Sequence, residues 1–485
     1  MALWTSVEQL GCEPVPVSRR HGKARDLGWV WFAANIGVLS LVFGAVLGAL
    51  GLDLMQALVA VAVGSALSFL LVGVVAVAGK WGGMPTLVLS RAAFGRRGNL
   101  GPAALGWVNV VGWEVVTSVV AAWALAMLAV LVLPTSPGQI VDASCLAIVV
   151  LASLTLGVLG HEAIVRFQRA ASLTFGALTL LVAAFLVSRT NWHEVATAHA
   201  ASLAGVVAAT SIVAAGTGLS WVNVAADYSR YLPGTEKGRH VVLWVALAST
   251  LPTMFIVIVG YLLASDLGGI ATSGDPIRLV GGVLPPWMAA PYLLAAVGGM
   301  LAQTDLACYS SGLGLMALGV RLRRSRTIFI DAGVVLGLGL VVMLGRQGFI
   351  GPFESFLEVL GDGLAAWAGV FLVDMWMARQ SARRRQLGVS LRRRDIADIG
   401  GESLAYHYLF TPDLKLAALV AWCSGTALAL ATTVCPWFTG PLAIGMLREG
   451  SFGFVVGFVT AVLVLLVLSL TIGSAGAVSD ANEHR

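Results

Sequence analysis

The feature that most constrains this chain is a repeated alternation of long apolar stretches with short polar gaps. Basic residues gather in every second gap, and only four of the 30 Lys and Arg residues fall in the alternate gaps: Arg189, Arg278, Arg346 and Arg448. A chain that crosses a bilayer many times shows this asymmetry, because loops rich in Lys and Arg stay cytoplasmic. The pattern therefore predicts an all-α integral membrane protein together with its orientation.

The composition supports this class. The chain is 58% hydrophobic and 11% charged, whereas soluble globular domains average roughly 45–50% and about 25%. The basic residues lie beside apolar stretches and would face anionic lipid, so the lipid bilayer is the expected partner and nucleic acid is not. The five cysteines show no metal-binding spacing. We expect no metal site and no cofactor, and the sequence does not predict an oligomeric state.

A helix needs about 20 predominantly apolar residues to span a membrane, and twelve stretches have this character. They are approximately 28–50, 54–79, 103–133, 141–160, 170–188, 202–225, 240–264, 288–319, 327–345, 353–377, 415–435 and 452–472. Twelve is even, so both termini are expected on one side, and the basic gaps make that side cytoplasmic. We expect a multi-pass protein of the plasma (cell inner) membrane.

The polar segments define the expected organisation. Residues 1–27 are interpreted as a cytoplasmic tail without a signal peptide, residues 378–414 as a basic cytoplasmic loop, and residues 473–485 as a second cytoplasmic tail. The core covers 28–377, and two further spans lie within 415–472. Because no soluble domain is inserted, we expect the chain to move a solute across the membrane.

Two apolar stretches have interiors that interrupt a helix. The first contains Asn35 and Gly37, and the sixth contains residues 216–220, which include two glycines and Ser220. Glycine weakens helix interiors, and Asn, Ser and Thr offer the backbone other partners. The breaks lie five stretches apart, which favours inverted repeats (about 28–188 and 202–377) framing a midplane substrate site. Alternatively, the glycines only allow close helix packing.

Several motifs carry a resemblance to a known family. They are Gly83-Met84-Pro85 with Ser90-Arg91-Ala92-Ala93-Phe94-Gly95, Asp227-Tyr228-Ser229-Arg230-Tyr231-Leu232-Pro233, Tyr309-Ser310-Ser311, and Asp374 with Arg379. From about residue 20 to residue 380 the chain resembles the nucleobase–cation symporters of the purine–cytosine permease type. The resemblance implies the five-plus-five inverted-repeat fold of the leucine-transporter type, with discontinuous first and sixth spans. It also implies substrates such as cytosine, purines, allantoin, hydantoins, thiamine or pyridoxine.

A flat heteroaromatic substrate needs aromatic side chains against its faces, and amides or carboxylates in the plane of its edge. The resemblance implies that spans one, three, six and eight line the site, and that Trp113 and Trp221 sandwich the ring. Trp107 is the alternative to Trp113 as the span-three tryptophan that stacks on the ring. The polar candidates for substrate binding are Asn35, Glu114, Thr117, Ser220, Asn223, Gln303 and Asp305.

Glu114 is the sharpest candidate, because an ionisable residue within a span is costly and normally faces a cavity or a partner. Its carboxylate is expected to accept N–H groups from the substrate edge or to carry a coupled proton. Alternatively, it is a buried bridge to a neighbouring span, and Asp305 has the same ambiguity. For Asp227 and Arg230 we expect a role in the inner gate or in folding the loop. For Asp374 we expect a helix cap or a salt bridge.

The chain departs from the family pattern in span eight. The resemblance implies that sodium-coupled members use a Ser and Thr hydroxyl pair where this chain has Leu301 and Ala302. A hard cation requires oxygen ligands, so we expect coupling to protons rather than to sodium. Ala307 stands where some members have Asn, which leaves Gln303 as the nearest amide.

Two rival functions remain. The first is a symporter for another solute on the same fold, such as allantoin, a hydantoin, a vitamin or an amino acid, with sodium as a possible coupling ion. The second is a membrane-embedded enzyme, which would need acids and histidines paired within the spans. The seven His residues lie in gaps, tails or span ends. We therefore predict a transporter, without enzymatic activity, that imports a nucleobase or a related heterocycle with protons.

Overall fold

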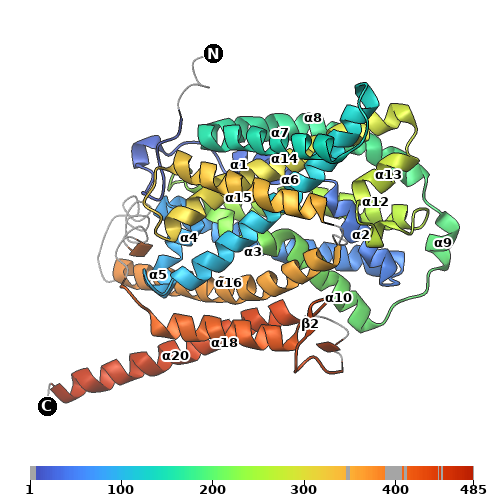
Figure 1. Ribbon diagram of the computed structural model, residues 1–485. Helices are drawn as coiled ribbons and strands as arrows, with labels where there is room; N and C mark the ends of the chain where they lie inside the picture. The colour runs from blue at the N-terminus through green and yellow to red at the C-terminus, as the bar shows by residue number, and fades with distance from the viewer. Residues whose placement is uncertain are drawn as a thin grey trace.

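The computed structural model describes residues 7–345, 350–387, 407–408, 412–445, 447–448 and 452–483. These residues are almost entirely helical (Figure 1). Within the described ranges, strands occur in one antiparallel pair, β1 (Val434–Cys435) with β2 (Phe438–Thr439). This pair includes the last two residues of the predicted eleventh span, because the helix there ends before Pro436. The predicted all-α class is confirmed.

The principal helices follow the predicted apolar stretches in order. They are α1 (Asp26–Ala33), α2 (Leu39–Ala49), α3 (Leu54–Gly82), α4 (Thr86–Leu89), α5 (Arg91–Phe94), α6 (Leu100–Val132), α7 (Gln139–Leu159), α8 (His161–Ser188), α9 (Trp192–Thr197), α10 (Leu203–Ala214), α11 (Ala225–Ser229), α12 (Gly238–Ala264), α13 (Pro276–Val283), α14 (Pro286–Ala317), α15 (Arg324–Leu344), α16 (Ile350–Leu387), α18 (Leu416–Thr432) and α20 (Gly453–Glu483).

Nine helical segments of the described chain are long and apolar enough to cross a membrane. The other three predicted stretches correspond to the α1–α2 pair, to α14 and to α18. Helix α14 carries Gln303, Thr304 and Asp305 in its middle, which lowers its apolar character. The helical membrane architecture is therefore confirmed, whereas the count of twelve crossings and the internal repeat stay predictions.

The ends of α3 show how the sequence sets a helix boundary. Asp53 caps the first turn by accepting a 2.8 Å hydrogen bond from the Gln56 N–H, and the Gln56 side chain accepts from the Asp53 N–H at 3.2 Å. At the other end Gly83 has φ 66°, a left-handed conformation that glycine adopts without steric cost. Pro85 follows shortly and prevents continuation of the helix.

Segments from distant parts of the chain share the two ends of the bundle (Figure 1). Helices α4 and α5, the segment before α1 and the far end of α20 lie on the left of the view, whereas α9, α13 and β2 lie on the right. Helix α16 continues through residues 378–387 of the predicted basic loop, and α20 continues through 473–483 of the predicted tail. The rest of that loop, except 407–408 and 412–414, lies outside the described residues, as do 1–6 and 484–485.

Helices α2 and α12 pack backbone against backbone through two glycines. A Cβ on Gly44 would overlap the carbonyl of Val257, and a Cβ on Gly260 would overlap the carbonyl of Leu41. Each helix therefore places a glycine where the other helix is closest. Small residues of this kind are characteristic of tight helix pairs in membranes.

The buried apolar residues form two large clusters, one toward each end of the bundle. The α5-side cluster includes Phe94 and reaches as far as Ala34, Val110, Leu219 and Leu306. The α13-side cluster includes Ile277 and begins at Ile36, Val111, Val213 and Met300. The two clusters thus meet at corresponding heights on four different segments. The helix breaks and the middle of α14 lie at this junction.

Candidate functional site

Buried polar side chains occupy the junction between the two apolar clusters. We call this group the polar layer; its members are at most 8% exposed, and they are Asn35, Ser65, Ser68, Gln168, Thr217, Thr253, Gln303, Thr304 and Asp305. Polar groups in a membrane interior are retained where they bond to one another or face a cavity. Three of the predicted site residues, Asn35, Gln303 and Asp305, belong to the polar layer.

The break in span one lies between α1 and α2, at residues 34–38. It leaves the Ala34 carbonyl outside the helical ladder, and the Gln303 amide of α14 donates to that carbonyl at 2.5 Å. The Asn35 amide donates to the Trp31 carbonyl at 2.7 Å, and its oxygen accepts from Thr253 at 3.4 Å. The structure thus brings Asn35 and Gln303 to the same break.

The break in span six follows α10. Residues Ala215–Leu219 form a π-helical turn in which Thr217 departs from helical geometry (φ −121°, ψ −108°), and Val222–Val224 form a 3-10 turn before α11. Thr217 donates to the Val213 carbonyl at 2.6 Å. A Cβ on Gly218 would overlap the backbone of Ser68 in α3, so the glycine is needed for close approach. Both predicted helix breaks are present.

Ser220 and Asn223 are held by α6. The Asn109 amide donates to the Ser220 carbonyl at 2.8 Å and to the Asn223 side-chain oxygen at 3.3 Å. The Asn223 amide donates to the Gly106 carbonyl at 2.8 Å. Both side-chain hydrogen bonds of Asn223 are therefore made with α6. Asn109 was not predicted, although its position one turn before Trp113 in an apolar span is a visible signal.

Three aromatic rings meet beside the breaks. Trp31 packs edge-to-face on Trp221, with ring centroids 5.9 Å apart and an interplanar angle of 86°, and it packs in the same way on Tyr228 at 5.8 Å. Trp221 packs against the α5-side cluster, whereas Trp113 belongs to the α13-side cluster. The two predicted indoles thus pack in different clusters. Trp31 was missed by the sequence analysis.

Thr117 and Trp107 connect α6 to α14. The Thr304 hydroxyl donates to the Thr117 hydroxyl at 2.8 Å, and Thr117 donates to the Trp113 carbonyl at 2.8 Å. The Trp107 ring lies close to Gly314, where an added Cβ would be 3.2 Å from the indole. Thr117 is therefore tied to the polar layer, whereas Trp107 packs about three turns away along α14.

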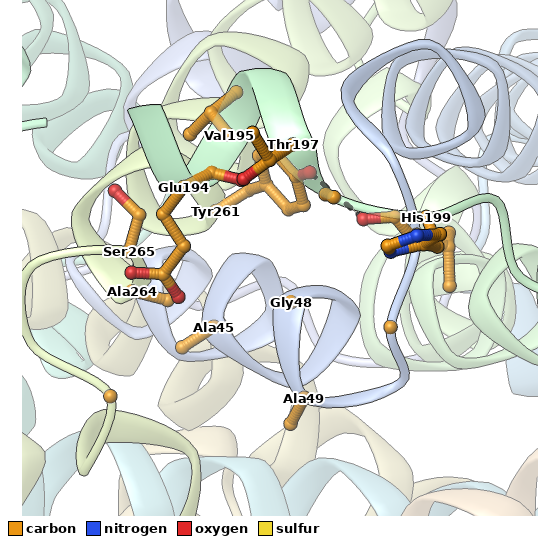
Figure 2. Close-up of a pocket in the computed structure, with 14 residues that line it drawn as sticks. Ala45, Gly48, Ala49, Glu194, Val195, Thr197, His199, Tyr261, Ala264 and Ser265 are labelled. Carbon is orange, nitrogen blue, oxygen red and sulfur yellow. Dashed lines mark hydrogen bonds between the residues drawn. The ribbon is translucent and has the colours of Figure 1, made fainter. Parts of the chain in front are cut away.

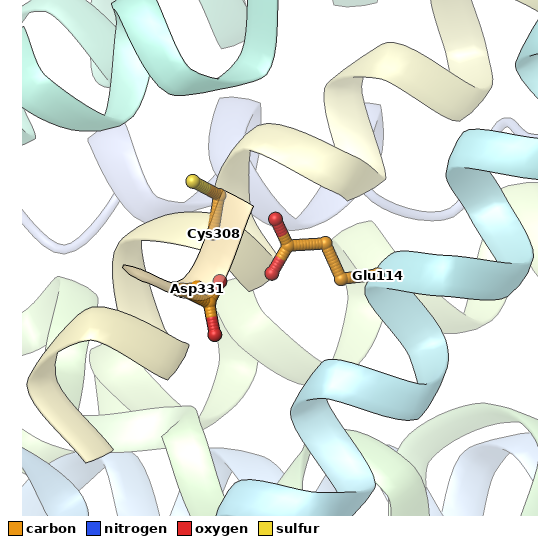
Figure 3. A group of neighbouring side chains, drawn as sticks. All are labelled: Glu114, Cys308 and Asp331. Carbon is orange, nitrogen blue, oxygen red and sulfur yellow. The ribbon is translucent and has the colours of Figure 1, made fainter. Parts of the chain in front are cut away.

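Glu114 points toward α14 and α15 (Figure 3). The Ser311 hydroxyl lies 3.1 Å from a Glu114 carboxylate oxygen and 2.6 Å from a carboxylate oxygen of Asp331, a residue for which no role was predicted. A hydroxyl has one hydrogen, so it donates to one carboxyl group and can bond the other only by accepting from its protonated form. The geometry therefore favours one shared proton in this pair.

The same region offers the donor atoms that a metal ion could use. Ligand atoms of Glu114, Cys308 and Asp331 lie within 4.8 Å of one another, and all three residues are buried. The Ser311 hydroxyl already bridges the two carboxyl groups, and a thiol beside two carboxylates combines soft and hard ligands. Hydrogen bonding therefore accounts for the arrangement.

Asp305 is directed toward α8. One of its oxygens accepts from the Gln168 amide at 2.7 Å, and the same amide donates to the Ala302 carbonyl at 2.7 Å. Leu301 and Ala302, where the resemblance implies a hydroxyl pair in sodium-coupled members, carry no side-chain oxygen. Gln168 was not singled out by the sequence analysis, because an amide in an apolar stretch is not distinctive without its partner.

The segment before α1 lies against the α5-side end of the bundle. Glu8 accepts hydrogen bonds from Arg230 at 2.8 Å and from Tyr231, and Arg230 also donates to Tyr309 at 2.8 Å and to the Gly11 carbonyl at 2.6 Å. Burial alone would raise the pKa of Glu8, but Arg230, Arg324, the Tyr231 hydroxyl and the His161 N–H together hold that pKa below its ordinary value.

Asp227 and Asp374 connect helices to the loops that join them. Asp227 accepts from the Thr86 N–H and from the Thr86 hydroxyl, both at 2.8 Å, so it joins α11 to α4. Asp374, expected to form a helix cap or a salt bridge beside Arg379, forms a salt bridge with Lys415 at 3.1 Å and also bonds His407 at 2.8 Å.

A recess of about 480 Å³ opens on the α13 side of the molecule, between α2, α9 and α12. Figure 2 shows Glu194 and Ser265 on one side of it and His199 on the other. Its lining residues include none of the nine predicted site residues. The recess is therefore separate from the polar layer.

Comparison with known proteins identifies relatives over nearly the whole chain. The family model described as "Permease for cytosine/purines, uracil, thiamine, allantoin" matches residues 14–457. A Bacillus subtilis protein named as a purine-cytosine permease is 27% identical over 386 residues, covering 77% of this chain and 80% of that protein. A purine-cytosine permease of Emericella nidulans is 24% identical over 485 residues, covering 96% and 89%.

Solved structures show the same fold. The nucleobase-cation-symport-1 family transporter Mhp1, in a closed conformation with bromovinylhydantoin bound, superposes with a TM-score of 0.70 and 18% identity, over 97% of each chain.

Proposed function

Because this chain belongs to the family of permeases for cytosine/purines, uracil, thiamine and allantoin, we propose that it imports a nucleobase (cytosine or a purine) or a related planar heterocycle by proton-coupled alternating access. Family membership confirms the resemblance drawn from the motifs and places the chain among transporters rather than enzymes. The choice of substrate, the coupling ion and the orientation with cytoplasmic termini in the cell membrane are parts of the proposal.

The observation that carries the proposal is the polar layer. At the junction of the two apolar clusters it bonds the span-one break to α14 and the span-six break to α3, and discontinuous helices of this kind are typical of midplane transport sites. Exposed backbone in a membrane is tolerated only where it is covered by protein or lines a cavity. A solute with in-plane donors and acceptors matches the amides and carbonyls gathered there.

We assign the faces of the ring to Trp113 and Trp221, which pack in the two clusters on either side of the polar layer. We assign its edge to Asn35, Gln303 and Thr117, because these side chains lie at the span-one break or bond to the middle of α14. Glu114, Ser220, Asn223 and Asp305 bond to neighbouring helices, so their roles are to position these groups or to handle protons.

Proton coupling is favoured by Leu301 and Ala302, since neither side chain supplies an oxygen for sodium. A symporter for an allantoin, hydantoin or vitamin substrate, driven by sodium, is the alternative. Uptake of labelled cytosine, purines, uracil, allantoin, thiamine and pyridoxine by cells that express the protein distinguishes them. We expect accumulation of at least one base, collapse by a protonophore and no dependence on sodium. Strong sodium dependence without an effect of pH contradicts the coupling.

A further inference from the structure

Asp305 and Gln168 each have one buried side-chain oxygen that accepts no hydrogen bond. Both residues are fully buried, and the Gln168 amide uses its nitrogen on Asp305 Oδ1 and on the Ala302 carbonyl, each at 2.7 Å. Asp305 Oδ2 and Gln168 Oε1 have no hydrogen-bond partner. An unsatisfied buried acceptor costs about 1–3 kcal/mol. These two oxygens belong to side chains that are already joined by the hydrogen bond from the Gln168 amide to Asp305 Oδ1.

The surroundings of this pair supply no compensating charge. Ala33, Ala171 and Ala302 form a small apolar cluster with Phe167 and Phe175, and the Gln168 amide bonds the carbonyl of Ala302 in that cluster. Within the described ranges no ion pair includes Asp305. An ionised carboxylate in an apolar interior without a cation is costly, so a buried acid in this position takes up a proton.

Titratable groups lie on three of the elements beside Asp305, namely α11, α8 and α1. Tyr228 of α11 faces it, with its hydroxyl bonded to the Leu306 carbonyl and to Ser310, each at 2.9 Å. On α8, Glu162 and Arg169 are exposed and Arg166 is partly exposed. On α1 the acid is Asp26, at the first residue of the helix and hydrogen-bonded to the Lys23 N–H. Tyr228 is a neutral neighbour, and Gln168 is an amide.

The pair is linked to the proposed substrate site through three helices. Ser172 of α8 donates to the Trp29 carbonyl of α1 at 2.9 Å, and Gln303 of α14 donates to the Ala34 carbonyl at the end of α1 at 2.5 Å. The bond between Gln168 and Asp305 joins α8 to α14 and completes the triangle. Asp305 is also two residues from Gln303 along α14, so a change in its protonation acts beside the break in span one.

We propose that Asp305 binds the coupling proton, with Gln168 as its positioning residue. The inference rests on the proposed function for its coupling role. A proton from water on the entry side binds Asp305 Oδ2, which becomes a donor and supplies the hydrogen that the orphaned acceptors lack. The neutral pair stabilises the contact of α8 with α14 and thereby the α1 segment that carries Asn35. The same proton leaves to water on the exit side, which restores the carboxylate.

Asp305→Asn tests the proposal, because the amide keeps the shape of the neutral acid and cannot release a proton. In proteoliposomes we expect substrate binding and counterflow within about threefold of wild type. Substrate affinity should lose its pH dependence, and accumulation driven by a pH gradient should disappear. Gln168→Leu should move the pH midpoint of uptake. Accumulation that persists in Asp305→Asn, or a midpoint unmoved by Gln168→Leu, overturns the proposal.

Asp362→Asn is the matched control. Asp362 of α16 is also fully buried and also has one oxygen without a partner, but it bonds Thr433 beside α18. We expect this variant to keep accumulation driven by a pH gradient. If Glu114→Gln abolishes that accumulation while Asp305→Asn does not, the coupling proton belongs to Glu114. Accumulation in wild type that follows sodium and is lost in Asp305→Asn also overturns the proposal, because Asp305 would then bind the cation.

A readout without substrate separates this inference from the proposed function. The infrared difference spectrum of wild type minus Asp305→Asn at neutral pH should contain the carbonyl band of a protonated carboxylic acid. Presence of the band without uptake of any tested heterocycle supports the proton site and contradicts the proposed function. Absence of the band contradicts the proton site even when uptake is observed.

Discussion

The side-chain amide of Asn109 donates to the backbone carbonyl of Ser220 at 2.8 Å, and this bond joins the first third of α6 to the break in span six. The same amide donates to the side-chain oxygen of Asn223 at 3.3 Å. Asn223 lies two residues after Trp221, so this contact also helps to position the segment that carries Trp221. We expect Asn109→Ala to leave both buried acceptors with one partner fewer, at about 1–3 kcal/mol of stability. Thermal unfolding in detergent measures the loss. An unchanged unfolding temperature contradicts this role.

The aromatic faces of the site can be tested with Trp221→Ala. Loss of one stacking partner costs about 0.5–1.5 kcal/mol beyond the lost burial, so substrate affinity should fall about tenfold or more. Trp221→Phe retains a ring and should recover most of the affinity. Trp113→Ala should behave like Trp221→Ala, whereas the exposed Trp192 of α9 is a control whose replacement leaves affinity unchanged. Equal affinity in Trp221→Ala and wild type removes Trp221 from the site.

Glu114→Gln distinguishes a structural pair from a substrate contact. The amide can donate to Asp331 and accept from Ser311, so we expect a change in stability below about 1 kcal/mol and substrate affinity within about twofold. Glu114→Ala removes a partner of both groups and should destabilise the protein by about 1–3 kcal/mol. Equilibrium binding and thermal unfolding measure the two effects. A tenfold loss of affinity in Glu114→Gln would instead show that the carboxylate accepts N–H groups from the substrate.

The Glu8–Arg230 pair predicts a stability that depends on pH. The pKa of Glu8 is lower in the folded protein than its ordinary value, so its contribution is complete above the ordinary Glu pKa of about 4.3 and is lost as the pH falls through the folded pKa. Removing one partner of a buried ion pair costs about 3–5 kcal/mol, and Glu8→Ala should show this loss at neutral pH.

The control for Glu8 is the Arg96–Asp413 pair, whose side chains are 66% and 53% exposed. Exposed pairs contribute about 0–1 kcal/mol, so Asp413→Asn should leave thermal stability nearly unchanged. Unfolding curves of wild type and Glu8→Ala that differ equally at neutral and strongly acidic pH would exclude the ionised pair as the cause.

The topology prediction places both termini in the cytoplasm. In a background without the native cysteines, Pro137→Cys lies in the gap between α6 and α7 and should react with an impermeant maleimide in intact cells. Asp413→Cys lies in the basic segment before α18 and should react only after the membrane is permeabilised. The prediction follows from the uneven distribution of Lys and Arg between alternate gaps. Labelling of position 413 from outside intact cells would contradict the predicted orientation.

Much of the fold could be predicted from local chemistry. Apolar length located the helices, and Asn35, Gly37 and residues 216–220 located both breaks, because these residues weaken a helix wherever they occur. Asp227 and Arg230 were expected to serve the loops or the gate, and their contacts agree with that expectation.

The partners of the buried polar residues could not be predicted. Asn109 and Gln168 bond backbone carbonyls and side chains more than a hundred residues away, and such contacts depend on the crossing of helices rather than on neighbouring residues. The direction of Glu114 toward Asp331 has the same origin. A helix position shows which residues share a face, but it does not show which neighbouring helix that face meets.

The glycine contact between α2 and α12 limits the motions available to a transport cycle. The backbones of the two helices are in direct contact at Gly44 and Gly260, where a side chain on either residue would overlap a carbonyl of the other helix. They are therefore expected to move as a single rigid body. We expect any rotation of α1 relative to that body to be absorbed at residues 34–38, where the helix is interrupted. Replacement of either glycine by alanine is expected to push α2 and α12 apart and so to change the rate of the transport cycle.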